Sequence, residues 1–363
     1  MRLMTIVGAR PQFIKAAAVS RAVRGQRAAG RPVIEESIVH TGQHYDHGMS
    51  QAFFDDLGIP APRHNLAING GGHGQMTGRM LERLEEIMLA DQPDWVLVYG
   101  DTNSTLAGAL AAAKLNIPVA HVEAGLRSFN RRMPEEVNRV MADHVSTLLL
   151  CPTRTAVDHL SREGLTRGVH LVGDVMYDIA MHARGTAAAQ STIMRDLGLT
   201  PRGFILATCH RAENTDDPQR LAGILAGLGT LAGALPVILP LHPRTAGIIA
   251  KRGLATPTGV RAIPPLGFMD MVMLESQAGL IATDSGGVQK EAYFYQTPCI
   301  TMRDETEWTE TVDSGWNRLV GADPVRIASG GRAAMAAQLP WDPTLYGDGH
   351  AAEKVVEHIL AAR

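Results

Sequence analysis

The chain has 363 residues, of which 45% are hydrophobic and 20% are charged, and its formal net charge at pH 7 is −3. This composition is typical of a folded globular protein long enough for two domains, and it excludes a fibrous or disordered chain. Because the charge is close to neutral, we expect neither nucleic acid nor an anionic membrane as a partner. The three cysteines, Cys151, Cys209 and Cys299, are odd in number and far apart, which argues against a disulfide framework and a structural zinc site.

The start of the chain, residues 3–7, has the pattern of a strand and not that of a signal peptide. No apolar run reaches the ~18–20 residues that a membrane-spanning helix needs. We therefore expect a cytoplasmic enzyme with no membrane partner.

Short apolar runs alternate along the chain with longer helix-like stretches, such as residues 104–115 and 136–144. This alternation predicts parallel sheets with helices on both faces. The strand candidates of the first half are residues 3–7, 36–39, 95–99, 118–122, 148–151 and 170–172. Those of the second half are residues 204–208, 236–239, 260–263, 280–283, 299–302 and 318–320.

The two series of strands predict an α/β protein with two doubly wound, Rossmann-like domains. We expect the first domain in residues 1–174, the second in residues 175–349, and a last helix in residues 350–363 that packs back on the first domain. Ligands of such sheets bind beyond the carboxyl ends of the strands. The active site is therefore expected in the cleft between the two domains.

Basic and polar residues follow the first two strands. Arg10 and Lys15 flank Pro11, which suits the first turn of a helix. At a helix start the two basic side chains could neutralise phosphate charge, although solvated surface residues would look the same in the sequence. Gln43 and His44 follow the second strand. The two histidines of this stretch, His40 and His44, could suggest a metal, but no carboxylate or third imidazole has ligand spacing, so we expect a loop that lines the cleft.

Three carboxylates follow later strands of the first half. Asp101 comes after a buried strand, where it could instead be a helix N-cap. Glu123 ends an apolar strand and therefore needs a partner, either Arg127 or a ligand. Glu135 opens a helix, where its charge would also favour the helix dipole. Because all three lie at the same edge of one predicted sheet, we interpret them as acid–base groups.

In the second half, His210 and Arg211 follow the first strand and His242 follows the next. A histidine at such a position can donate a proton to a phosphate or to a leaving group. A histidine of a capped loop is the alternative for His210.

Residues 283–292, Thr-Asp-Ser-Gly-Gly-Val-Gln-Lys-Glu-Ala, join a buried strand to a predicted helix. The free backbone N–H groups at the helix start, from Ser285 onward, favour a phosphate, and Gly286 and Gly287 would let it approach closely. Glu291 lies further along the helix and could reach a ribose hydroxyl. An N-cap followed by glycines for packing is the alternative. A phosphate cradle in one domain and acids in the other is the layout of a nucleotide-sugar site.

Seven stretches of the chain together resemble the non-hydrolysing UDP-N-acetylglucosamine 2-epimerases, over nearly the whole length. They are Gly-Ala-Arg-Pro-Gln-Phe-Ile-Lys, His-Thr-Gly-Gln-His, Gly-Asp-Thr-Asn-Ser-Thr, His-Val-Glu-Ala-Gly-Leu-Arg, Pro-Glu-Glu-Val-Asn-Arg, His-Arg-Ala-Glu-Asn and Thr-Asp-Ser-Gly-Gly-Val-Gln-Lys-Glu-Ala, in that order. The resemblance implies the two-domain fold called GT-B. It also implies interconversion of UDP-N-acetylglucosamine and UDP-N-acetylmannosamine without a metal or other cofactor. We expect a homodimer whose partners are the UDP-sugar and UDP.

In this family a base removes the proton at C2 while UDP leaves C1, and a proton returns to the opposite face of C2 as UDP adds back. The resemblance implies that Asp101, Glu123 and Glu135 are the acid–base groups and that His210 assists the departing UDP. The residues that it implies in substrate binding are Arg10, Lys15, Gln43, His44, Arg211, His242, Ser285, Gly286, Gly287 and Glu291.

Residues 128–134, 288–291 and 345–349 look instead like a subgroup that acts at C2 of UDP-2,3-diacetamido-2,3-dideoxy-glucuronate. Arg131 or Arg132 could pair with the carboxylate of such a sugar, and two solvated arginines are an equal alternative.

Residues 43–47 and 69–78 depart from many bacterial members, the latter in the segment where those members place a second, activating UDP-N-acetylglucosamine. Allosteric activation is therefore in doubt. Epimerisation at C3 and a retaining GT-B glycosyltransferase remain open, although the glycosyltransferase would leave the three strand-end acids unexplained.

Overall fold

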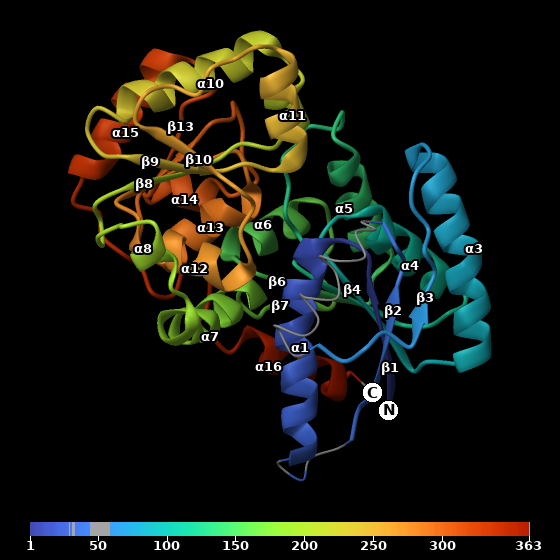
Figure 1. The fold of residues 1–363 in the computed structure, drawn as a ribbon. Helices are drawn as coiled ribbons and strands as arrows, with labels where there is room; N and C mark the ends of the chain where they lie inside the picture. The colour runs from blue at the N-terminus through green and yellow to red at the C-terminus, as the bar shows by residue number, and fades with distance from the viewer. Residues whose placement is uncertain (29, 31–32, 44–58, 363) are drawn as a thin grey trace. The chain divides into compact units, whose positions relative to one another are not determined.

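The computed structural model describes residues 1–28, 30, 33–43 and 59–362. The chain forms two compact units, one made of Met1–Ile179 with Pro343–Arg363 and the other of Ala180–Asp342. Each contains a parallel sheet with helices packed against it (Figure 1). The predicted α/β class is therefore confirmed.

Within the described residues, the sheet of the first unit has the strand order β3-β2-β1-β4-β5-β6-β7, and all its pairings are parallel. The strands are β1 Arg2–Val7, β2 Glu35–His40, β3 His64–Asn65, β4 Trp95–Tyr99, β5 Val119–Val122, β6 Leu148–Cys151 and β7 Val169–Leu171. The helices are α1 Arg10–Ala28, α3 His73–Asp91, α4 Asn103–Lys114, α5 Pro134–Val145, α6 Arg154–Arg162, the first part of α7 Val175–Gln190, and α16 Ala351–Ala361.

Alternating side chains explain how this sheet is covered on two faces. Met4 and Ile6 of β1 pack in one hydrophobic cluster with α3 and α4 residues such as Met80 and Ala107. The intervening residues of the strand point to the opposite face, because successive side chains of a strand alternate. All five residues of β4 are buried, as expected for a central strand of a parallel sheet.

Within the described residues, the sheet of the second unit has the order β10-β9-β8-β11-β12-β13, again all parallel. Its strands are β8 Ile205–Thr208, β9 Val237–Pro240, β10 Val260–Ile263, β11 Leu280–Thr283, β12 Cys299–Thr301 and β13 Asn317–Leu319. Its helices are α8 Ile193–Asp196, α9 Ala212–Thr215, α10 Pro218–Leu231, α11 Pro243–Lys251, α12 Phe268–Gln277, α13 Gly286–Phe294, α14 Thr309–Asp313 and α15 Pro324–Ala336.

The predicted strands all form, within one or two residues at each end. The sequence missed β3, because a two-residue strand, His64–Asn65, has no apolar pattern. The contact boundary between the units falls after Ile179, where residue 174 was expected, and the chain rejoins the first unit at Pro343.

Helix α16 packs against α1 in the first unit (Figure 1). Its start is fixed by Asp178, whose carboxylate accepts hydrogen bonds from the backbone N–H of Ala351 at 3.2 Å and of Ala352 at 2.7 Å. This cap satisfies two of the N–H groups that a helix start leaves without partners.

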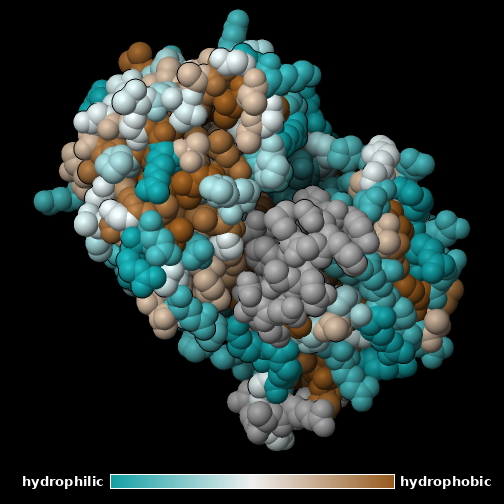
Figure 2. Space-filling view, viewed as in Figure 1, coloured by the Kyte–Doolittle hydropathy of each residue, from teal (hydrophilic) through white to brown (hydrophobic). Residues whose placement is uncertain are grey.

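The visible surface of the first unit is mostly hydrophilic, with small hydrophobic patches between charged side chains, and the visible face of the second unit shows more hydrophobic residues (Figure 2). In the part of the chain that the structure describes, none of the helices is long and apolar enough to cross a membrane. The three cysteines are free and buried, in agreement with the absence of a disulfide framework.

Candidate functional site

The turn between β1 and α1 is closed by the side chain of Gln12. Its amide oxygen accepts from the N–H of Gly8 at 2.8 Å and of Ala9 at 3.1 Å, and its amide nitrogen donates to the carbonyl of Tyr99 at 2.8 Å. A Cβ on Gly8 would lie 2.1 Å from the hydroxyl of Thr41, so this position requires glycine. Gln12 thus ties the loop after β1 to the end of β4.

Lys15 and Glu123 form a buried ion pair at this edge of the sheet. Lys15 Nζ lies 2.6 Å from Glu123 Oε1, and the two side chains are only 9% and 8% exposed. The sequence offered Arg127 or a ligand as the partner of Glu123, and the observed cation is neither: it is Lys15 of α1, far away in the sequence. Glu123 has a φ of +70°, an uncommon conformation for a residue with a side chain, which places its carboxylate beyond the end of β5.

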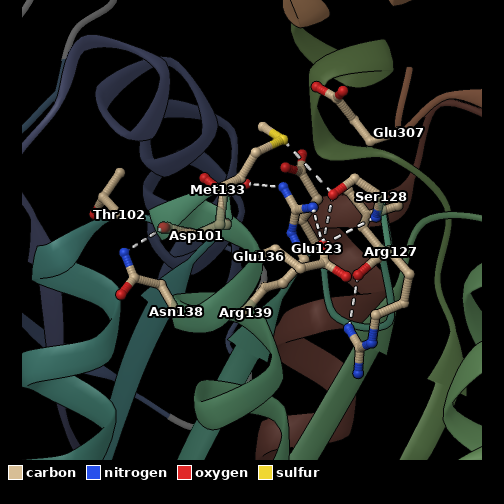
Figure 3. A network of polar contacts seen from close by, with 12 residues as sticks. Asp101, Thr102, Glu123, Arg127, Ser128, Met133, Glu136, Asn138, Arg139 and Glu307 are labelled. Carbon is tan, nitrogen blue, oxygen red and sulfur yellow. Dashed lines mark hydrogen bonds and ion pairs between the residues drawn. The ribbon is translucent and has the colours of Figure 1, made fainter. Parts of the chain in front are cut away.

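Asp101 pairs with Arg139 of α5, and Arg139 also lies 2.7 Å from the carboxylate of Glu136 (Figure 3). Asp101 is not the N-cap of α4, as the alternative interpretation had it, because the cap is Thr102, which accepts from the N–H of Thr105 at 3.2 Å. The carboxylate of Asp101 is thus left to pair with a cation, and its side chain is 28% exposed.

Glu136 anchors the loop that precedes α5. Its carboxylate accepts from the backbone N–H of Ser128 at 2.9 Å and of Phe129 at 3.0 Å (Figure 3). Burial by itself raises the pKa of Glu136, but the N–H of Ser128 and the guanidinium of Arg139 outweigh it and hold the pKa below its usual value. Glu136 is therefore a structural anion, whereas its neighbour Glu135 was the predicted acid–base group.

Glu135 lies in the first turn of α5 and is partly exposed. No described residue pairs with its carboxylate, in contrast to Asp101 and Glu123. The three predicted acids therefore follow β4, follow β5 and begin α5 of the same unit, and two of them have a buried cation beside them.

The remaining predicted site residues of the first unit are Gln43, Arg10 and His44. Gln43 accepts from the N–H and the hydroxyl of Ser104, at 3.1 and 2.8 Å, and so joins the loop after β2 to the start of α4. Arg10 is the first residue of α1. His44 lies outside the described residues.

In the second unit, Asp284 connects the loops after β8 and β11. It is fully buried, and its carboxylate accepts from the N–H of His210 at 3.0 Å, the N–H of Arg211 at 3.0 Å and the amide of Asn214 at 3.2 Å. The imidazole Nδ1 of His210 lies 3.6 Å from the same carboxylate, and the side chain is 46% exposed. Asp284 thus fixes the position of an accessible histidine.

Helix α13 begins directly after this aspartate. Its N-cap Ser285 makes no side-chain capping bond, so the hydroxyl does not occupy the N–H groups of the first turn. A Cβ on Gly286 would lie 2.4 Å from Glu307 Oε1, whereas a Cβ on Gly287 would meet only Ser285 Oγ, at 3.9 Å. A side chain on Gly286 would have to displace the carboxylate of Glu307, whereas Gly287 is exposed and leaves open space over the helix start. Glu291 is partly exposed one turn further on.

His242 is the N-cap of α11, since its Nδ1 accepts from the N–H of Arg244 at 3.2 Å. This structural role explains its position without a ligand. In the part of the chain that the structure describes, no cluster of three or more His, Cys, Asp or Glu side chains could hold a metal ion.

The sequence missed the residues that hold the predicted ones in place, namely Gln12, Glu136, Arg139 and Asp284. The only signal for Arg139 was its spacing, one helical turn after Glu135. Asp284 stood beside Ser285 in the quoted motif and was read only as part of a turn.

The comparisons with known proteins agree with this arrangement. The model of the UDP-N-acetylglucosamine 2-epimerase family matches residues 26–360. The UDP-2,3-diacetamido-2,3-dideoxy-D-glucuronate 2-epimerase of Pseudomonas aeruginosa is 52% identical over 99% of both chains. The UDP-N-acetylglucosamine 2-epimerase of Methanocaldococcus jannaschii is 39% identical over 98% of both chains. A crystal structure of the M. jannaschii epimerase with UDP-GlcNAc and UDP has a TM-score of 0.90 to this fold, with 39% identity and 100% of both chains covered. The predicted GT-B-like fold class and the predicted family are thus confirmed, and the chain belongs to the UDP-N-acetylglucosamine 2-epimerase family.

Proposed function

We propose that this protein inverts the configuration at C2 of a UDP-2-acetamido sugar by eliminating and re-adding UDP. The observation that carries the proposal is the set of carboxylates around β4, β5 and α5, two of them paired with buried cations. Inverting C2 requires proton transfer on both faces of one carbon, and therefore at least two acid–base groups. Asp101, Glu123 and Glu135 would supply them.

In the first half of the reaction a carboxylate takes the proton from C2. The electron pair of that C–H bond forms a C1=C2 double bond, and the C1–O bond breaks with its electrons going to the β-phosphate of UDP. In the second half the phosphate oxygen attacks C1 again, and C2 takes a proton on the opposite face. No net oxidation occurs, so the step needs no redox cofactor.

The second unit would hold the nucleotide. The N–H groups of Gly286 and Gly287 at the start of α13 suit a pyrophosphate, because the helix dipole favours negative charge there. The predicted backbone donor Ser285 is different, because its N–H already donates to the hydroxyl of Thr283 at 2.9 Å. Glu291 would take the ribose, and His210, held by Asp284, would stabilise the departing phosphate together with Arg211.

For the sugar, we propose UDP-2,3-diacetamido-2,3-dideoxy-D-glucuronate. What supports it is the 52% identity to an enzyme with that name, against 39% to a UDP-N-acetylglucosamine 2-epimerase. Arg131 and Arg132 are exposed in the loop before α5 and are candidates for the uronate carboxylate. UDP-N-acetylglucosamine remains the second candidate, since the family model carries that name.

The test is to incubate the protein with each UDP-sugar in deuterated water, after exhaustive chelation of metals. We expect the 2-epimer of the uronate to form with one deuterium at C2, and Glu123→Gln to abolish both events. An epimer without deuterium at C2 would contradict elimination, and a label at C3 would move the reaction to that carbon. Efficient turnover of UDP-N-acetylglucosamine with none of the uronate would refute only the choice of sugar.

We also propose a homodimer. Three large apolar side chains, Leu89, Val137 and Met141, are 45–60% exposed on α3 and α5, and both helices pack against α4. Light scattering that gives a mass near 39.0 kDa, that of one chain, would contradict it.

A further inference from the structure

A histidine that the proposed reaction does not use lies on β5, two residues before Glu123. His121 of β5 is completely buried. Its Nδ1 lies 2.7 Å from Asp143 Oδ1, and its Nε2 lies 2.7 Å from the backbone carbonyl of Gly100. Both ring nitrogens are thus within hydrogen-bond distance of an oxygen.

Neither Asp143 Oδ1 nor the carbonyl oxygen of Gly100 donates a hydrogen bond to the ring. A backbone carbonyl can only accept, so Nε2 carries a proton. Asp143 is held as a carboxylate, because its other oxygen accepts from the N–H of Gly125 at 3.1 Å and from Arg127 at 2.7 Å. Burial alone raises the pKa of Asp143, but His121 and Arg127 outweigh burial and keep that pKa below its usual value. Nδ1 therefore carries a proton too.

The charges around the ring balance. Arg127 reaches beyond Asp143 to both carboxylate oxygens of Glu163, each at 2.7 Å (Figure 3 shows Arg127). A protonated His121, Asp143, Arg127 and Glu163 then alternate in sign and sum to zero. A buried cation is tolerated when it is paired and fully hydrogen-bonded, which is the case here.

The two backbone partners of this chain of charges belong to the turns that carry Asp101 and Glu123. Gly100, with a φ of +60°, directly precedes Asp101, and its missing Cβ would lie 3.2 Å from Lys15 Nζ. Gly125, with a φ of +81°, ends the turn that starts at Glu123. Glycine adopts these left-handed conformations without strain, so the hydrogen bonds to the carbonyl of Gly100 and to the N–H of Gly125 are what tie the two turns to His121 and Asp143.

We propose that His121 is a positioning residue which donates a hydrogen bond from each ring nitrogen and, with Asp143, holds the two catalytic carboxylates at their spacing. This inference rests on the proposed function, because that function makes Asp101 and Glu123 catalytic. His121 touches no substrate atom and acts through Gly100, and Asp143 acts through Gly125.

The protonation state is measured on the whole protein without substrate. In long-range ¹H–¹⁵N spectra of histidine-labelled protein, with His121→Gln to assign the signal, we expect both nitrogens of His121 to carry protons at pH 7 and pH 8. Asp143→Asn should remove the proton from Nδ1 alone, because an amide can donate to that nitrogen. A wild-type His121 with one unprotonated nitrogen at pH 7 would overturn the proposal.

The positioning role is measured by kinetics and by UDP binding. Because a side chain displaced by 1 Å can cost about 100-fold in rate, we expect His121→Gln and Asp143→Asn to lower kcat ~10–100-fold with KM nearly unchanged. The dissociation constant of UDP should not change. His144→Gln is the matched control, since His144 is exposed on α5 beside Asp143 and, among the described residues, bonds only the carbonyl of Val140.

Variants with kcat equal to that of His144→Gln would refute positioning, even if His121 is protonated. If His121→Gln does not fold, Asp143→Asn and the wild-type spectrum still decide. A wild type that epimerises neither sugar refutes the proposed function instead, and the spectrum then still shows whether His121 is protonated.

Discussion

Removing Lys15 tests whether Glu123 depends on its buried cation. In Lys15→Met the carboxylate of Glu123 stays at a site where it is 8% exposed, without the ammonium that now lies 2.6 Å away. The chain can respond by protonating the carboxylate. At pH 7 that costs about 3.7 kcal/mol, since an ordinary glutamate titrates near 4.3 and each pH unit is worth about 1.36 kcal/mol.

This figure agrees with the ~3–5 kcal/mol that breaking a buried ion pair usually costs. For a unit of about 200 residues, ~3–4 kcal/mol corresponds to a fall in Tm of roughly 6–16 °C. The cost should shrink on acidification, to about 1.6 kcal/mol at pH 5.5, because protonation becomes cheaper by the same rule. Differential scanning calorimetry at the two pH values measures both effects.

The chain offers a matched control in Lys354, which pairs with Asp348 at 2.9 Å on the surface, where the two side chains are 36% and 58% exposed. Lys354→Met should cost less than about 1 kcal/mol. The double variant Lys15→Met/Glu123→Gln should recover most of the lost stability, since no charge is then left buried. If Lys15→Met lowers Tm no more than Lys354→Met, the reasoning about the buried pair is wrong.

Three further predictions follow from the structure. Gly287→Ala should leave Tm within about 2 °C, because the added Cβ would meet Ser285 Oγ at 3.9 Å and no closer described atom. If a phosphate approaches the backbone of Gly287, calorimetric titration should show UDP binding weakened at least about tenfold. An unchanged affinity for UDP would show that Gly287 is not part of the site. Burial raises the pKa of Asp178 from its usual 3.8 to about 6, so this group stabilises the folded state fully below pH 3.8 and the stabilisation is lost as pH rises through 6, by roughly 2–3 kcal/mol in all. Urea unfolding gives the free energy of unfolding of Asp178→Asn and of the wild type at pH 4 and at pH 8. The difference, variant minus wild type, should be more positive at pH 8 than at pH 4. A difference that is the same at both pH values would contradict this. Of Arg131→Ala and Arg132→Ala, one should lower kcat/KM on the diacetamido-uronate ~10–1000-fold and leave any activity on UDP-N-acetylglucosamine unchanged; equal losses on both sugars would mean that the arginine does not read the uronate carboxylate.

The sequence predicted the strands well because both sheets are parallel and buried, so each strand is a short apolar run between helices. It failed at β3, where two polar residues extend the edge of a sheet by pairing with β2. It also placed Asp101, Glu123 and Glu135 after the correct elements, because polar residues at the carboxyl ends of parallel strands gather at one edge.

The partners of these acids could not be predicted in the same way. Lys15 and Glu123 are 108 residues apart, and Arg139 and Asp101 are 38 apart. Pairing at such distances depends on how the helices lie on the sheet, and periodicity in the sequence carries no information about it. Arg127 looked like the natural partner of Glu123 because it is near in sequence, yet it extends to Asp143 and Glu163 instead.

Helix α5 explains why these separate pairs form one constellation. Asn138 donates to the carbonyl of Asp101 at 2.9 Å, and Arg139 binds the carboxylate of that residue. Glu136 holds the loop before the helix, and Asp143 holds the turn after Glu123. Consecutive residues of a helix differ by about 100° in direction, so a shift of one residue in the register of α5 would break all four contacts together. Glu135 is fixed by the same register, which means that the geometry of one twelve-residue helix sets the relative positions of all three proposed acid–base groups.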